Sequence, residues 1–137
     1  MTLLDTGYFL ALFNPRDALH ARAEARSDSL DGPFIVTEYV LWECVNALSK
    51  PENRDTAHII ADYIQNGEMC QMISASPEML AEGLRLHRQH RDKEWSLTDC
   101  ISFHVMNTQG TTRALAHDHH FEQAGFEALL RRSPPGD

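Results

Sequence analysis

The sequence predicts an α/β fold with three layers (α/β/α), in which helices cover both faces of a central parallel sheet of four or five strands. Short apolar runs without alternation recur along the chain, and this is the pattern of strands buried on both faces. Segments of helical length separate these runs, as parallel strands require. The 137 residues, of which 42% are hydrophobic and 23% charged, are typical of one globular domain with a single core.

Local signals bound the elements in the first half of the chain. Asn14-Pro15 ends a helix, because proline disfavours helical backbone in the residue before it. Asp17 and Thr37 are each placed to cap the start of a helix, and Asp31-Gly32-Pro33 marks a turn. The elements expected here are strands over 2–4 and 34–36 and helices over 8–13, 17–27, 37–48 and 55–65.

The second half opens with a strong helix start at Ser76-Pro77, a capping residue followed by proline at the first helical position. Ser96–Asp99 resembles a capping box and begins another helix. The elements expected here are strands over 69–73, 113–116 and 126–130, helices over 76–91 and 96–109, and a helical turn over 119–124. We therefore expect one domain over residues 1–132 and a frayed C-terminal tail over 133–137.

Composition excludes several classes of protein. The net charge of -8 argues against a protein that coats nucleic acid without specificity, because a polyanion would be repelled. No apolar run approaches the roughly 20 residues of a membrane-spanning helix, and Asp5 interrupts the N-terminus where a signal peptide would be apolar. Three cysteines, odd in number and far apart, fit a reducing compartment. We expect a cytoplasmic protein with no membrane partner.

Two aspartates follow predicted strands. Asp5 comes directly after the first strand, and Asp118 follows the strand over 113–116. Each of them alone is more often a turn residue. In an open parallel sheet, however, the carboxyl ends of the strands meet at one edge, and ligands bind there. We therefore expect these carboxylates, far apart in sequence, to lie at the same edge.

Two further acids lie on predicted helices. Asp99, in the first turn of its helix, suits the helix dipole, but it shares an apolar stripe with Phe103 and Met106. Glu43 lies opposite the stripe expected to face the core, which favours a surface charge, although its neighbours one turn away are not plainly solvent-exposed. That stripe consists of Leu41, Val45 and Leu48. Four acids at strand ends and on helices together indicate an oxygen-rich site for a hard divalent cation.

At these residues the chain resembles a PIN domain, and in particular the VapC-like ribonucleases of toxin–antitoxin pairs. The matching segments come in the family's order and cover most of the chain from residue 2 to 126. They are LLDTGYFLALF, VTEYVLWECVNAL, SLTDCISFHVM and ALAHDHHFEQAGF. The resemblance implies a metal-dependent endoribonuclease that hydrolyses phosphodiester bonds of single-stranded or structured RNA.

The resemblance also implies roles for individual residues. It assigns binding of one or two Mg²⁺ or Mn²⁺ ions, and catalysis, to Asp5, Glu43, Asp99 and Asp118. It gives Thr6 and Thr98 secondary roles as hydroxyl groups near the metal. The metal would activate a water for in-line attack, and either Asp99 or Glu43 could orient that water. The histidines at 117, 119 and 120 leave open whether Asp118 contacts the metal directly.

The resemblance implies three partners: an RNA substrate, an antitoxin protein and a second copy of the chain. An apolar groove for a partner peptide would use Tyr8, Phe9, Leu12 and Phe13, whose alternative place is the core. The basic segment Arg85–Lys93 is either a solvated helix end or an RNA-backbone track leading toward Asp99. The arginines expected to contact RNA are Arg85, Arg88 and Arg91.

Three alternatives compete with this interpretation. An inactive domain of the same fold would only bind RNA or protein, and the intact set of acids argues against it. Zinc is the main rival chemistry, since histidines crowd residues 117–120. Consecutive histidines on one loop cannot all face one tetrahedral ion, and the HExxH motif is absent from the sequence. A phosphoaspartyl phosphatase would need an acid where this chain has Gly7.

Overall fold

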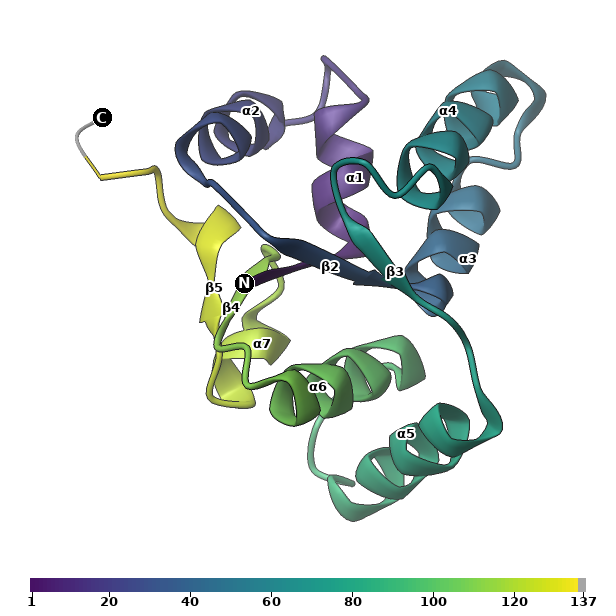
Figure 1. Cartoon of the computed structure of the whole chain (residues 1–137), viewed down its shortest axis with the longest axis vertical. Helices are drawn as coiled ribbons and strands as arrows, with labels where there is room; N and C mark the ends of the chain where they lie inside the picture. The colour runs from purple at the N-terminus through teal and green to yellow at the C-terminus, as the bar shows by residue number, and fades with distance from the viewer. Residues whose placement is uncertain (136–137) are drawn as a thin grey trace.

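A computed structural model describes residues 1–135 and contains one sheet of five parallel strands, in the order β3-β2-β1-β4-β5 (Figure 1). In the central strand, Leu3 pairs with Ile35 on one side and with Ala114 on the other. The parallel sheet expected from the sequence is confirmed. The strands are β1 (Thr2–Leu4), β2 (Phe34–Thr37), β3 (Gln71–Ile73), β4 (Arg113–Leu115) and β5 (Glu127–Ala128).

Helices cover both faces of the sheet, so the three-layer arrangement is also confirmed. The first four helices lie on one face and the last three on the other (Figure 1). Leu3 and Leu4 point to opposite faces, because side chains alternate along a strand, and each is buried in one of two apolar cores. The helices are α1 (Thr6–Leu12), α2 (His20–Ser29), α3 (Glu38–Ala47), α4 (Arg54–Gln65), α5 (Pro77–Gln89), α6 (Leu97–Gln109) and α7 (His119–Gln123).

The last strand is shorter than the one expected over 126–130, and that expectation is wrong. β5 ends at Ala128, and Leu129–Arg131 form a short 3₁₀ helix. Leu129 and Leu130 are both buried in the core beneath α1 to α4. Consecutive residues of a strand point to opposite faces, so only a helical turn lets both leucines enter the same core.

Two other elements begin later in the structure than the sequence predicted. The helix expected over 17–27 begins at His20, because the side chain of Asp17 accepts a hydrogen bond from the backbone of Leu19 (2.8 Å) and forms a turn first. The strand expected over 69–73 begins at Gln71, where pairing with Ile35 of β2 starts.

The C-terminal segment contacts α2 through a buried arginine. Arg26 donates hydrogen bonds to the carbonyl oxygens of Leu129, Arg132 and Ser133. Pro134 is buried as well. The first two residues of the expected tail therefore lie against the domain, while residues 136 and 137 lie outside the described residues. The domain boundary at residue 132 stays a prediction.

Candidate metal centre

The acids gather at the carboxyl ends of β1 and β4, the two adjacent strands at the centre of the sheet. The backbone amide of Asp5, which follows β1 directly, donates to the carbonyl oxygen of Leu115 at the end of β4 (3.2 Å). From β1 the chain continues to β2 and β3 on one side of the sheet, whereas β4 and β5 lie on the other side of β1. The direction in which strands are added therefore reverses between β1 and β4, and ligands of open parallel sheets bind in the crevice at such a point.

Asp5 is buried in a negative environment. The pKa of its carboxyl is raised from 3.8 to about 8, first by burial and then by the charge of Asp99. Glu43 and Asp118 act in the same direction, against a hydrogen bond from the Thr6 backbone. Three carboxylates from three other parts of the chain therefore surround Asp5. The structure brings all four predicted acids together.

Glu43 reaches this cluster from α3, so the surface position favoured for it is wrong. The buried residues of α3 are Val40, Leu41 and Cys44, whereas Val45 and Leu48 are only half-buried. The helix is therefore rotated relative to the stripe expected from the sequence. Glu43 is half-buried and accepts a hydrogen bond from the Thr6 hydroxyl. Its direction depends on how α3 docks on the sheet.

Asp99 is both a helix cap and a member of the cluster. Its backbone amide donates to the Ser96 hydroxyl (3.0 Å), and its Oδ2 accepts from the Ser96 amide (3.2 Å), which completes the expected capping box. Phe103 and Met106 are buried on the same stripe, as the sequence predicted. The cap holds the Asp99 carboxylate in place at the start of α6.

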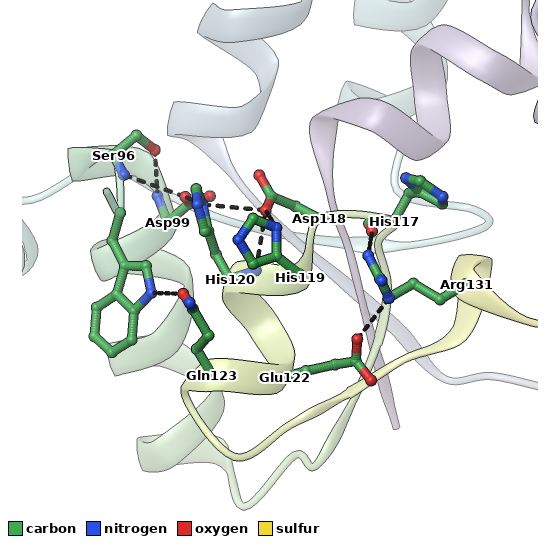
Figure 2. Close-up of polar contacts among 10 residues, drawn as sticks. Ser96, Asp99, His117, Asp118, His119, His120, Glu122, Gln123 and Arg131 are labelled. Atoms are coloured by element: carbon green, nitrogen blue, oxygen red, sulfur yellow. Dashed lines mark hydrogen bonds and ion pairs between the residues drawn. The ribbon is translucent and has the colours of Figure 1, made fainter. Parts of the chain in front are cut away.

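Asp118 and His120 complete the cluster from α7. Asp118 caps α7, and its Oδ1 accepts from the His120 backbone amide (3.0 Å). The ring of His120 lies between two carboxylates, with Nδ1 3.1 Å from Oδ2 of Asp99 and 3.1 Å from Oδ1 of Asp118 (Figure 2). His119 is exposed and lies 3.5 Å from Asp118, and His117 points away from the cluster (Figure 2).

The structure thus singles out one histidine where the sequence left three open. One feature of the sequence points to His120: it lies two residues after Asp118, the acid that caps the short helix α7. At this position in the first turn of a helix, the backbone amide points toward the capping side chain. The direction of the ring depends on contact with α6, which no local pattern reveals.

The other expected site residues lie further out. Thr98 lines a largely apolar cavity of about 600 Å³ beside Glu43, together with Trp42 and Leu80. The side chain of Arg85 pairs with Glu82 (2.8 Å). Arg88 and Arg91 line a separate hollow at the C-terminal end of α5, with His87, His90 and Lys93, whereas the N-terminal end of α5 lies beside Thr98. The structure therefore does not bring these arginines to the acids.

The four residues expected to form an apolar groove differ in their burial. Tyr8 and Phe9 are buried in the core, so they cannot receive a partner peptide. Leu12 and Phe13 are half-buried and pack against the same core.

The donor set fits a divalent cation. Within residues 1–135, no lysine or arginine forms an ion pair with any of the four acids. Mutual repulsion among carboxylates is costly when no cation balances it, and the charges of Asp99, Glu43 and Asp118 add to burial in raising the pKa of Asp5. Carboxylate oxygens are the ligands that hard divalent ions prefer. A bound cation would supply the missing positive charge.

The family model of the PIN domain matches residues 2–127. This chain belongs to the PIN domain family. This PIN domain is 27% identical over 126 residues to the 23S rRNA-specific endonuclease VapC20 of Mycobacterium tuberculosis, in two strains. The alignment covers 92% of this chain and 95% of the relative. The family expected from the four sequence segments is confirmed.

Solved structures show the same fold. The crystal structure of M. tuberculosis VapC20, described as a Sarcin-Ricin loop cleaving toxin, matches with a TM-score of 0.88 and 25% identity, over 93% of this PIN domain and 98% of that chain. FitAcB from Neisseria gonorrhoeae matches with a TM-score of 0.66 and 18% identity, over 93% and 95% of the two chains, which supports the fold alone. Within residues 1–135, no helix is both long and apolar enough to cross a membrane.

Proposed function

We propose that this PIN domain is a metal-dependent endoribonuclease and the toxin of a toxin–antitoxin pair. One observation carries the proposal: four carboxylates gather where the strand order reverses, and in the part of the chain that the structure describes none of them pairs with a lysine or arginine. The relative that cleaves 23S rRNA aligns over nearly the whole chain, which supports RNA as the substrate. A module that only bound RNA would have no use for such a costly arrangement of acids.

In the proposed mechanism, Asp5, Glu43, Asp99 and Asp118 would hold Mg²⁺ or Mn²⁺. When bound there, the ion would supply a water of lowered pKa and stabilisation of the negative charge that develops on the phosphodiester. The chain's own task is to orient the carboxylates. The Thr6 hydroxyl orients Glu43, and the Ser96 amide orients Asp99. The backbone amide of His120 does the same for Asp118.

The proposal includes partners and a location. Trp42, Leu80 and Leu84 are exposed apolar side chains on α3 and α5, and such a patch supports a homodimer. Light scattering should return a dimer at micromolar concentration, and a monomer would contradict this part of the proposal.

The antitoxin would be a small protein encoded beside this chain and should co-purify with it. The enzyme would act in the cytoplasm, and Arg88 and Arg91 would contact RNA away from the metal.

The test is cleavage of labelled RNA by the purified wild-type chain. One substrate is a stem-loop with the sarcin–ricin sequence of 23S rRNA, because the relative's structure is described as that of a toxin that cleaves this loop. A single-stranded RNA of the same length is the second. We expect cleavage in Mg²⁺ or Mn²⁺ that chelator abolishes. Chelator-resistant cleavage would contradict the metal mechanism, and binding of either RNA without cleavage would indicate the inactive module.

A further inference from the structure

His120 lies inside the acid cluster and not at its edge. Its side chain is 14% exposed, whereas that of the neighbouring His119 is 57% exposed. A single ring atom, Nδ1, lies 3.1 Å from a carboxylate oxygen of Asp99 and 3.1 Å from one of Asp118. These carboxylates belong to different elements, α6 and the start of α7. His120 is therefore positioned by the tertiary structure.

We infer that Nδ1 of His120 is a nitrogen ligand of the metal centre, so that the site selects a first-row transition-metal cation, with Mn²⁺ as the test case, over Mg²⁺. This inference rests on the proposed function only in taking the acid cluster as a metal site. It goes further in naming His120 as the residue that decides which ion the site binds.

The separations within the cluster match a coordination sphere. Neighbouring ligand atoms lie about 3 Å apart when six ligands surround an ion at about 2.1 Å. The spacing of 3.1 Å from Nδ1 to each carboxylate oxygen agrees with this value. The ligand atoms of Asp118, His119 and His120 all lie within 4.8 Å of one another. Nδ1 would bind a cation through its lone pair, in the tautomer that carries the ring proton on Nε2.

The backbone that carries the ring is held by contacts within α7 and between α7 and α6. The backbone amide of His120 donates a hydrogen bond to Asp118, which fixes this residue in the cap of α7. The next residue, Phe121, is fully buried and packs edge-on against Phe103 of α6 (centroids 5.0 Å apart). Gln123 accepts a hydrogen bond from the Trp95 indole (3.0 Å), just before α6 (Figure 2). Because both helices are tied together, Nδ1 stays beside Asp99.

The consequence for selectivity follows from ligand type. Mg²⁺ takes oxygen ligands and gains little from imidazole, whereas first-row transition-metal ions bind imidazole nitrogen well. Replacing one oxygen ligand by Nδ1 of His120 therefore favours Mn²⁺ over Mg²⁺. We assign this preference to His120, because His117 points away from the cluster. His119 lies 3.5 Å from Asp118 and packs against the His120 ring (centroids 4.6 Å apart), but within residues 1–135 it forms no ion pair with Asp99.

The test uses Mn²⁺ as the probe and does not depend on RNA cleavage. Pulsed electron paramagnetic resonance of the Mn²⁺-loaded wild-type chain should show coupling to a directly bound ¹⁴N nucleus. His120→Gln keeps a polar side chain but removes the imidazole, so this coupling should disappear. Calorimetry should show that Mn²⁺ affinity falls by at least about tenfold in His120→Gln. Mg²⁺ affinity should change much less.

His117→Gln is the matched control, because it makes the same chemical change three residues away on a ring outside the cluster. It should keep both the nitrogen coupling and the wild-type preference for Mn²⁺. Mn²⁺ that binds wild type without nitrogen coupling would overturn this inference and leave the proposed metal site intact. Absence of any Mn²⁺ or Mg²⁺ binding would instead overturn the proposed function. Nitrogen coupling that persists in His120→Gln and vanishes in His119→Gln would assign the ligand to His119 and overturn the role of His120.

Discussion

The hydroxyl of Thr6 donates a hydrogen bond to Oε1 of Glu43, a residue 37 positions further along the chain. Thr6 begins α1 directly after Asp5, and Glu43 lies on α3. This bond therefore joins two helices at the carboxyl end of β1, and it orients one predicted metal ligand from the residue beside another. Loss of a group that orients a metal ligand typically lowers metal affinity by about 10- to 100-fold.

Removing the Thr6 hydroxyl should weaken the site without unfolding the chain. Thr6→Val has almost the same shape but cannot donate to Glu43, so we expect Mn²⁺ affinity to fall by about tenfold. Thr6→Ser keeps the hydroxyl and should stay close to wild type. Calorimetric titration with Mn²⁺ measures the difference. Equal affinities of Thr6→Val and wild type would mean that the bond does not matter for the metal.

Neutralising the central acids should abolish cleavage. Asp5→Asn and Asp99→Asn keep the shape of each side chain, and asparagine caps a helix about as well as aspartate. Loss of a metal ligand should reduce the rate of RNA cleavage by at least about 100-fold. The matched control is Asp17→Asn, the same change in a turn outside the cluster, which should keep wild-type activity. A fully active Asp99→Asn would show that this carboxylate is not needed.

The metal-free protein should lose stability as the pH rises through the window set by Asp5. The pKa of this carboxyl is raised from 3.8 to about 8, so the folded state holds a proton that the unfolded state releases between those values. The free energy of unfolding therefore falls as the pH rises, by an amount on the order of a few kcal/mol. Asp5→Asn removes this loss.

Thermal melts in chelator, at about pH 4 and about pH 8, test this stability prediction. We expect similar melting temperatures for wild type and Asp5→Asn at the lower pH, because the unfolded carboxyl has only begun to release its proton there. At the higher pH the variant should melt well above wild type. A wild-type advantage at the higher pH would reverse the sign and contradict the buried, protonated carboxyl.

Metal binding should release a proton from Asp5 near neutral pH. Below its pKa of about 8 this carboxyl is mostly protonated, and a cation binds the ionised form. The apparent affinity for Mn²⁺ should therefore rise with pH until it passes about 8. Calorimetry in buffers of different ionisation enthalpy counts the protons. The same release at about pH 7 and about pH 9 would rule out Asp5 as the source.

Gly83 should be intolerant of a methyl group, because α5 and α6 pack in close contact there. A Cβ at this position would overlap Cγ1 of Ile101 and lie 3.2 Å from Cδ1 of Leu97. Alanine favours a helix over glycine by about 1 kcal/mol, but overpacking of a core costs about 1–3 kcal/mol. We expect Gly83→Ala to lower the free energy of unfolding, measured by denaturant titration.

Ile101→Ala provides the control for this clash. The double variant Gly83→Ala/Ile101→Ala should be more stable than the sum of the single effects predicts, because the second change removes the atoms that the new methyl group meets. Additive effects would mean that the cost of Gly83→Ala arises elsewhere in α5.

The sequence by itself determined the fold class, most of the elements and the place of two acids. Apolar runs, capping residues and prolines act within a few residues, so they can be read locally. Because the carboxyl ends of parallel strands meet at one edge of a sheet, the sequence alone places Asp5 and Asp118 at the same edge. The capping box at Ser96–Asp99 is equally local, and the structure contains it as expected.

Only the tertiary structure decided which way several side chains point. Glu43 turns toward Asp5 because α3 docks on the sheet through Val40 and Cys44, and a small rotation of a helix moves a residue from solvent to the site. Leu129 and Leu130 enter one core by leaving the strand. His120 lies between two carboxylates because α7 packs on α6. These directions depend on contacts between residues distant in sequence, and local patterns carry no information about them.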